Sequence, residues 1–115
     1  MLKSKLVIRD TDTLEAAMVA IENNNYRSVI VVNQNDVVVG TLSDGDARKS
    51  VLDHRLLSTP VHRVMNPNFI ALTVTEREKA ARIFNETHVF LIPLIDEHGQ
   101  LVDVLTAYPP PPPVR

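Results

Sequence analysis

The stretch Val29–Leu42, which reads VIVVNQNDVVVGTL, decides the fold. Four consecutive apolar residues, Val29–Val32, predict a strand that is buried on both faces, because a half-exposed strand would alternate apolar and polar residues. Asn33–Asp36 then supplies turn-forming residues, and Val37–Leu42 predicts the returning strand. The stretch therefore predicts a β-hairpin at the centre of a folded unit.

Helices are predicted on both sides of this hairpin. A short apolar strand, Leu6–Ile8, is predicted first, followed by a helix whose N-cap is Asp12, because a glutamate stands three residues later as in a capping box. The run Asn23–Asn25 predicts the end of that helix, since Asn tolerates the left-handed conformation. A second helix is predicted to begin near Asp44 and to end at about His54. The first helix has an apolar stripe at helical spacing, formed by Leu14, Ala17, Met18 and Ile21.

The same order of elements recurs after a shift of 63 residues. Asp12–Asp44 then aligns with Thr75–Ala107 without a gap, and both copies change periodicity at the same offsets. In the second copy, Thr75 with Glu78 predicts a capping box and Leu91–Ile95 predicts the buried strand. Each copy is too small to bury a sufficient core alone, so we expect the two to pack sheet against sheet.

The predicted fold class is therefore α+β, with two β-α-β-β-α repeats packed around a pseudo-twofold axis. The predicted division is a first repeat over residues 1–58, a second over 59–108 and a proline-rich tail over 109–115. One helical turn is predicted at Val61–Met65, at the start of the second repeat. Pro109–Pro113 stands where a closing helix should follow, and five prolines predict an extended polyproline II arm or a linker remnant instead.

Composition excludes several classes of function. The chain has 115 residues with 12 Lys and Arg against 14 Asp and Glu, so we expect no nucleic-acid partner. It has no Cys, which removes disulfides, thiolate metal sites and thiol nucleophiles. No apolar stretch is long enough to cross a membrane, and the start does not resemble a secretory signal. We therefore expect a cytoplasmic protein that does not bind membranes.

The segment Gly40–Asp46, which reads GTLSDGD after a capped helix and a buried strand, resembles a CBS domain. Two such units in tandem resemble a CBS pair, or Bateman module, and the resemblance covers about residues 5–108. The spelling SDGDAR at Ser43–Arg48 is similar to that of CBS pairs attached to sugar-nucleotide nucleotidylyltransferases and sugar-phosphate isomerases. The resemblance implies a regulatory module rather than an enzyme. It would bind AMP, ADP, ATP or S-adenosylmethionine between the repeats and control an attached or partner enzyme.

The resemblance also implies the ligand contacts. Asp46 would accept hydrogen bonds from both ribose hydroxyls, Ser43 would donate to a phosphate, and Arg27 would supply a basic phosphate contact. This chemistry is sound, because one carboxylate can accept two hydroxyls and a helix N-terminus favours phosphate. The nucleobase would lie against the first strand of the second repeat. The full expected ligand set is Asp46, Ser43, Arg27, Ser28, Ile70, Ala71, Leu72 and Arg48.

The second copy departs from this pattern, and simpler interpretations stay open. The position of Asp46 is taken by Pro109 and that of Arg27 by Phe90, so we expect at most one competent site per chain. Ser43 and Asp46 could form only a capping box, and Arg48 could face solvent. The four histidines lack metal-ligand spacing, so we expect them at the surface and expect no metal or cofactor. The alternative function is a ligand-free dimerisation or interaction module, and the family resemblance implies a homodimer in either case.

Overall fold

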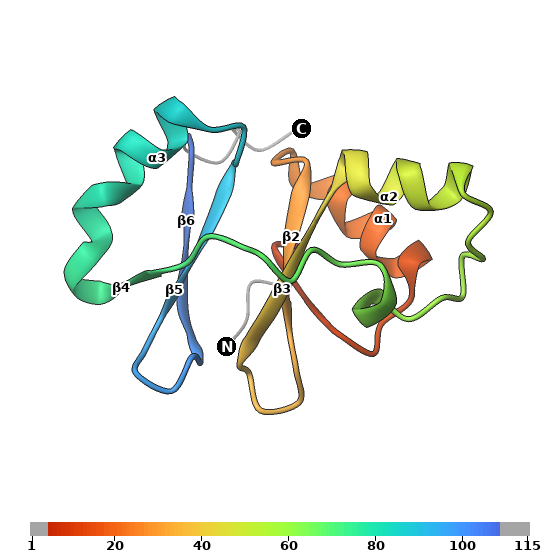
Figure 1. The fold of residues 1–115 in the computed structure, drawn as a ribbon, viewed down its shortest axis with the longest axis horizontal. Coiled ribbons are helices and arrows are strands. Elements are labelled where there is room, and N and C mark those ends of the chain that lie inside the picture. The colour runs from red at the N-terminus through yellow and green to blue at the C-terminus, as the bar shows by residue number, and fades with distance from the viewer. Residues whose placement is uncertain (1–4, 109–115) are drawn as a thin grey trace, which may run out of the picture.

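The computed structural model describes residues 5–108, and its elements follow the predicted order (Figure 1). Repeat one consists of β1 (Val7–Arg9), α1 (Leu14–Asn24), β2 (Ser28–Val32), β3 (Val38–Ser43) and α2 (Asp44–Leu52). A connector with the 3₁₀ helix η1 (Val61–Arg63) leads to repeat two. Repeat two consists of β4 (Leu72–Thr73), the 3₁₀ helix η2 (Val74–Lys79), α3 (Ala80–Glu86), β5 (Leu91–Ile95) and β6 (Leu101–Thr106). The predicted polyproline arm, Pro109–Pro113, lies outside the described residues.

Each repeat forms a three-stranded sheet with the same topology. The orders are β1-β2-β3 and β4-β5-β6, with the first pair parallel and the second antiparallel in each sheet. The ladder is irregular between Val31 and Val32, and again between Leu94 and Ile95, which are the same positions after a shift of 63 residues. The two copies therefore share a local irregularity as well as their order of elements. The predicted α+β fold of two repeats is confirmed.

The two sheets pack face to face, and the helices cover their outer faces (Figure 1). Alternate residues of β2 point in opposite directions. Val29 and Val31 pack with the helices of repeat one, and Ile30 and Val32 pack against repeat two. All four are completely buried, as expected for a strand covered on both faces. The layer between the sheets contains residues from both repeats, among them Val7, Tyr26, Ile30, Val32, Val38, Leu91 and Val104.

Backbone hydrogen bonds join the repeats at the tips of their hairpins. The N–H of Val38 donates to the carbonyl of Gly99 at 3.0 Å, and the N–H of Leu101 donates to the carbonyl of Asp36 at 2.9 Å. The connector is bonded to β3 in the same manner, because Thr41 and Asn66 exchange two bonds of 3.1 and 2.7 Å. The two Thr41–Asn66 bonds hold the connector against β3 as it passes from one repeat to the other.

The predicted start of α2 near Asp44 is confirmed, but the predicted starts of the first helix in each repeat are wrong by one or two residues. Thr13, rather than Asp12, is the N-cap of α1, and its hydroxyl accepts from the N–H of Ala16 at 3.1 Å. The Asp12 carboxylate turns back and accepts from the N–H of Arg9 at 2.9 Å, so it cannot cap the helix. In repeat two the capping box is Thr73 with Glu76, rather than Thr75 with Glu78, because a 3₁₀ helix precedes α3. The earlier start places those two predicted residues inside the 3₁₀ helix.

Other predicted boundaries agree more closely. Asn25 ends α1 with a φ of 65°, as the Asn run predicts, and β5 has the predicted bounds. Helix α2 ends at Leu52, before the predicted end, and His54 already has a φ of 68°. The predicted turn at Val61–Met65 is a 3₁₀ helix of three residues. Val61 is completely buried in the core of repeat one, so the connector packs on the first repeat.

Candidate functional site

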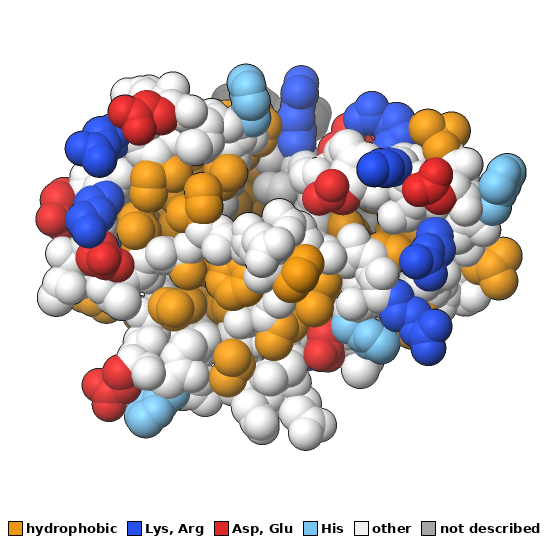
Figure 2. All heavy atoms as spheres, in the orientation of Figure 1, with side chains coloured by type: hydrophobic (Ala, Val, Ile, Leu, Met, Phe, Trp, Pro, Cys, Tyr) orange, Lys and Arg blue, Asp and Glu red, His pale blue; other side chains and the backbone are white. Residues whose placement is uncertain are grey.

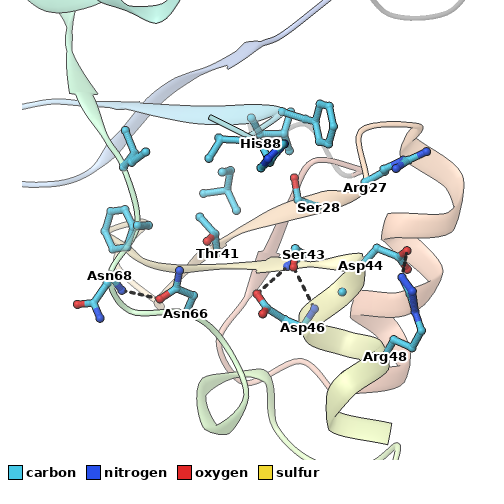
Figure 3. Close-up of a pocket in the computed structure, with 17 residues that line it drawn as sticks. Arg27, Ser28, Thr41, Ser43, Asp44, Asp46, Arg48, Asn66, Asn68 and His88 are labelled. Carbon is cyan, nitrogen blue, oxygen red and sulfur yellow. Dashed lines mark hydrogen bonds and ion pairs between the residues drawn. The ribbon is translucent and has the colours of Figure 1, made fainter. Parts of the chain in front are cut away.

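A cavity of about 490 Å³ lies at the seam, with walls from both repeats (Figure 3). Repeat one contributes the start of α2, the end of β3 and the start of β2. The second wall comes from the connector before β4 and the segment that leads into β5. In the space-filling view the surface is recessed between the two repeats, with charged side chains over the helices of repeat one (Figure 2). Volumes of this size are typical of small-molecule sites.

The start of α2 places two polar side chains in the cavity. Ser43 is the N-cap, and its hydroxyl accepts from the N–H of Asp46 at 3.0 Å. The Asp46 carboxylate accepts from the N–H of Ser43 through Oδ2, at a long distance of 3.4 Å. A bond of that length is weak, so little is lost if the carboxylate turns toward a ligand. Within residues 5–108 the other oxygen, Oδ1, accepts no hydrogen bond.

The backbone of α2 adds a donor beside this carboxylate. The N–H of Asp44 donates to the carbonyl of Arg27 at 2.8 Å, and that of Asp46 is used by the cap. The N–H of Gly45 has no acceptor in the described part of the chain, and a Cβ there would meet only Ser43 Oγ, at 3.8 Å. A free N–H at a helix start lies at the positive end of the helix dipole, and this position favours the binding of an anion.

Two arginines lie near this helix start, and they differ in their partners. Arg48 is exposed and forms an ion pair of 2.8 Å with Asp44 one turn earlier on α2. Arg27 forms no ion pair with any residue of the described range, and its guanidinium carbon lies 6.0 Å from the centroid of the Phe90 ring. Its side chain points away from Ser43 and Asp46 in Figure 3. Arg27 therefore stands at the rim of the cavity as a cation that forms no ion pair with a carboxylate of residues 5–108.

The opposite wall is mainly apolar. Phe69 and Ile70 from the connector, with Phe90 and Leu91 from the start of β5, face the polar groups of α2. Ile30 of β2 also lines the cavity and is completely buried. The cavity thus offers an apolar surface on one side and hydrogen-bonding groups on the other. Such a division fits a ligand with a flat apolar part, hydroxyl groups and a negative charge.

Six of the eight expected ligand residues line this cavity. They are Arg27, Ser28, Ser43, Asp46, Arg48 and Ile70. The other two, Ala71 and Leu72, do not line it. Leu72 is 5% exposed and packs with Ile92 and Leu94 in the core of repeat two. The wall is formed by residues just before β4, because the chain enters the core of repeat two where that strand begins.

Several lining residues are absent from the expected set. Asn66 and Asn68 lie on the connector, Thr41 lies on β3, and His88 precedes β5 (Figure 3). Asn66 could have been suspected only from its place between two prolines, since a connector has no periodicity. His88 is exposed, as expected for the histidines, but it stands at the cavity. No group of His, Asp or Glu in residues 5–108 could hold a metal ion.

These features define a class of protein, namely a two-repeat α+β module with a ligand-sized cavity at the seam. Residues 1–53 match the CBS domain family. CBSX2 of Arabidopsis thaliana, solved in complex with AMP, superposes with a TM-score of 0.71 and 24% identity, over 90% of this chain and 83% of that one. A CBS domain protein from Pyrobaculum aerophilum, also complexed with AMP, gives 0.73 and 17%, over 92% and 82%.

Residues 1–53 therefore belong to the CBS domain family, and the chain has the fold of a tandem CBS pair, as the resemblance implies. Arabinose 5-phosphate isomerase GutQ of Salmonella typhi is 30% identical over 90 residues, which are 77% of this chain. This chain spans 28% of the length of that relative. None of the helices in residues 5–108 is both long and apolar enough to span a membrane.

Proposed function

We propose that this chain is a cytoplasmic regulatory module, not an enzyme, that binds an adenine nucleotide in the cavity between its repeats. The observation that carries this proposal is the Asp46 carboxylate beside the free N–H of Gly45, facing an apolar wall from the other repeat. The carboxylate would accept the ribose hydroxyls, and the helix start with Arg27 would attract the phosphate. The adenine would lie between Ile70 and Phe90. AMP in two structures of the same fold supports this choice of ligand.

Isothermal titration with AMP, ADP, ATP and S-adenosylmethionine tests the proposal. We expect saturable binding of at least one of them, with one ligand per chain. In Asp46→Asn the charge is lost, while an acceptor for the Ser43 N–H remains. Hydrogen bonds to charged groups contribute about 1.5–3 kcal/mol, so the affinity should fall about tenfold or more. Absence of binding to every nucleotide at millimolar concentration would refute the proposal.

Two controls separate ligand contact from helix capping. Glu76→Gln alters a different capping box, at the start of the first helical segment of repeat two, and Glu76 does not line the cavity. It should leave nucleotide affinity unchanged, even if it lowers stability as Asp46→Asn does. The second control is 2′-deoxy-AMP. If Asp46 binds the ribose, this analogue should bind the wild type more weakly than AMP does, and the two ligands should bind Asp46→Asn almost equally.

We infer that the regulated enzyme, attached or separate, acts on a sugar phosphate. The match to part of an arabinose 5-phosphate isomerase supports this class of enzyme. The test is the isomerase activity of the enzyme joined to or co-purified with this chain, measured with and without the nucleotide that binds. A change in rate that Asp46→Asn abolishes is expected. An activity that is indifferent to the nucleotide would contradict the inference.

A second candidate function is dimerisation through the helical side of repeat one. Large apolar side chains are exposed there, and the most exposed are Leu52 and Leu56 at 72% each. Burying them against a second copy would be favourable at roughly 25 cal/mol per Å² of apolar area. Light scattering should give twice the chain mass of 12.9 kDa, and Leu52→Lys with Leu56→Lys should return it to one. A dimer indifferent to every nucleotide would favour this function over ligand sensing.

A further inference from the structure

The side chain of Tyr108 lies against repeat one, far from its own position in the sequence. Its ring stacks on the ring of Tyr26, with centroids 4.9 Å apart and planes 24° apart. Its hydroxyl donates to the carbonyl of Asn25 at 2.7 Å, and the Tyr26 hydroxyl donates to the carbonyl of Tyr108 at 2.9 Å. Phe90 meets the Tyr108 ring edge-on at 6.2 Å. Two hydrogen bonds and two ring contacts thus hold one residue at the end of β6.

The repeat symmetry identifies the place that Tyr108 occupies. A shift of 63 residues relates Tyr108 to Gly45, Tyr26 to Val89 and Asn25 to His88. Gly45, Val89 and His88 all line the candidate cavity. Tyr108 and its partners therefore correspond to the lining of a second cleft between the repeats. In the first cavity Gly45 contributes no side chain, whereas in the second cleft a tyrosine stands at that position and its ring covers the opposite wall.

We propose that Tyr108 is a built-in occupant of the second cleft, and that its docking is coupled to ligand binding in the first cavity. The first part predicts at most one ligand site per chain for a reason that is independent of the missing carboxylate. The second part rests on the proposed nucleotide binding. It predicts that a nucleotide in the cavity and Tyr108 in the cleft stabilise each other, as reciprocity between coupled sites requires.

The loop Asn25–Arg27 provides the physical connection. At one end, the carbonyl of Asn25 accepts from Tyr108, and at the other the carbonyl of Arg27 accepts from the N–H of Asp44 at the start of α2. Both Asn25 and Arg27 have left-handed backbone conformations, with φ of 65° and 62°. Asn tolerates this conformation, but for Arg it is unfavourable and needs support from its surroundings. Docked Tyr108 supplies part of that support and so holds Arg27 at the rim of the cavity.

Phe90 gives a second contact between the two sites. It lines the first cavity, its ring lies under the Arg27 guanidinium, and its edge meets Tyr108. A nucleotide that draws Arg27 to its phosphate or stacks on Phe90 would change the surface on which Tyr108 docks. Tyr108 directly precedes the run Pro109–Pro113 in the sequence. Docking therefore fixes the last point of the chain before that run.

Fluorine NMR on protein labelled with 3-fluorotyrosine tests docking without any ligand. The chain has two tyrosines and no tryptophan, so the spectrum should contain two signals, which Tyr26→Phe and Tyr108→Phe assign. We expect the Tyr108 signal to be shifted from free 3-fluorotyrosine by the neighbouring rings. A Tyr108 signal at the free position would overturn the occupancy of the second cleft.

Titration with the nucleotides then tests coupling. The Tyr108 signal should move with the same midpoint as the calorimetric isotherm. Tyr108→Ala should lower AMP affinity about threefold to tenfold, the equivalent of about one hydrogen bond, and Tyr108→Phe should lower it less because the ring stays. Adenosine should be less affected, since Arg27 acts on the phosphate. Calorimetric binding with an unmoved signal and equal affinity in Tyr108→Ala would overturn the coupling. Absence of all binding would instead remove the proposed function and leave the ligand-free spectrum to decide occupancy.

Discussion

Gly40 of β3 lies against the connector, and replacing it by alanine tests how tightly the seam is built. A Cβ on Gly40 would lie 2.7 Å from Sδ and 2.9 Å from Cγ of Met65, and 3.0 Å from the carbonyl oxygen of Asn66. The methionine side chain could turn away. The Asn66 carbonyl could not do so freely, because it accepts the N–H of Thr41 at 3.1 Å. Gly40→Ala must therefore push the connector outward or weaken its bonds to β3.

The expected cost follows from these contacts. Forcing an extra methyl group into a packed site costs about 1–3 kcal/mol, and a weakened pair of backbone bonds lies within the same range. In thermal unfolding, 1 kcal/mol corresponds to a shift of about 4–8 °C for a domain of nearly this size. We expect Gly40→Ala to lower the Tm by at least about 4 °C. Nucleotide affinity should fall as well, because Asn66 and Asn68 on the connector line the cavity.

Gly45→Ala is the matched control. The same methyl group at this position meets only Ser43 Oγ, at 3.8 Å, and Gly45 lies in the first turn of α2. Alanine favours helix over glycine by up to about 1 kcal/mol, so this variant should be as stable as the wild type or more so. Urea and thermal unfolding of the three proteins, followed by circular dichroism, give the comparison. A Gly40→Ala protein that is as stable as Gly45→Ala would refute the argument that close packing of the connector holds the seam.

Three further predictions concern other parts of the fold. Ile30→Ala removes a completely buried side chain from between the sheets and should lower the free energy of unfolding by about 2–5 kcal/mol. Circular dichroism and tyrosine fluorescence should show both repeats unfolding in one transition. The N–H of Thr73, together with Lys79, holds the pKa of Glu76 below its usual value of 4.5. The ionised carboxylate therefore stabilises the fold at pH values above 4.5, and this contribution disappears as the pH falls through the lowered pKa. Urea unfolding from neutrality through pH 4.5 should show Glu76→Gln less stable than the wild type at neutrality, with the two curves converging in acid. Asn25→Ala should destabilise by about 1–2 kcal/mol, because alanine disfavours the left-handed conformation at the end of α1, whereas thermal unfolding of Asn25→Gly should show a much smaller loss.

The sequence predicts those parts of the fold in which one property repeats along the chain. A continuous apolar run requires a strand covered on both sides, and Leu91–Ile95 accordingly has the predicted bounds. Helix starts are harder, because neighbouring residues compete for the same cap. Asp12 and Thr13 can both accept from a helix N–H, and only the turn that brings Arg9 close to Asp12 decides between them. The local sequence pattern predicts that a helix forms, whereas tertiary contacts determine the residue at which it begins.

The candidate site divides in the same way. Ser43 and Asp46 belong to a continuous motif at a helix start, so their neighbours in sequence are also their neighbours in space. The opposite wall is formed by the packing of one repeat on the other, and no local pattern marks Asn66, Asn68 or His88. The 63-residue shift could have indicated His88, because it aligns His88 with Asn25. Asn25 stands two positions before Arg27 in the sequence. Pairing equivalent positions across a repeat therefore gives information that a motif search does not.

The arrangement of contacts along the seam limits how a ligand could act. At the hairpin tips the repeats are joined by backbone bonds, Val38 to Gly99 and Leu101 to Asp36, and the Gln100 side chain adds a bond of 2.9 Å to the carbonyl of Asn35. The cavity lies at the other end of β2 and β3, where the α2 start and the β5 start face each other across open space. At a free concentration of one hundred times its Kd, a ligand there can stabilise an arrangement with the two repeats closed around it by about 2.7 kcal/mol. This holds only if the ligand binds poorly when the repeats are further apart. Because the hairpin tips resist separation, this free energy would act on a rotation about them. Such a rotation would displace the cavity end most, and it would have to change the two hydrogen bonds that join Tyr108 to Asn25 and Tyr26 there.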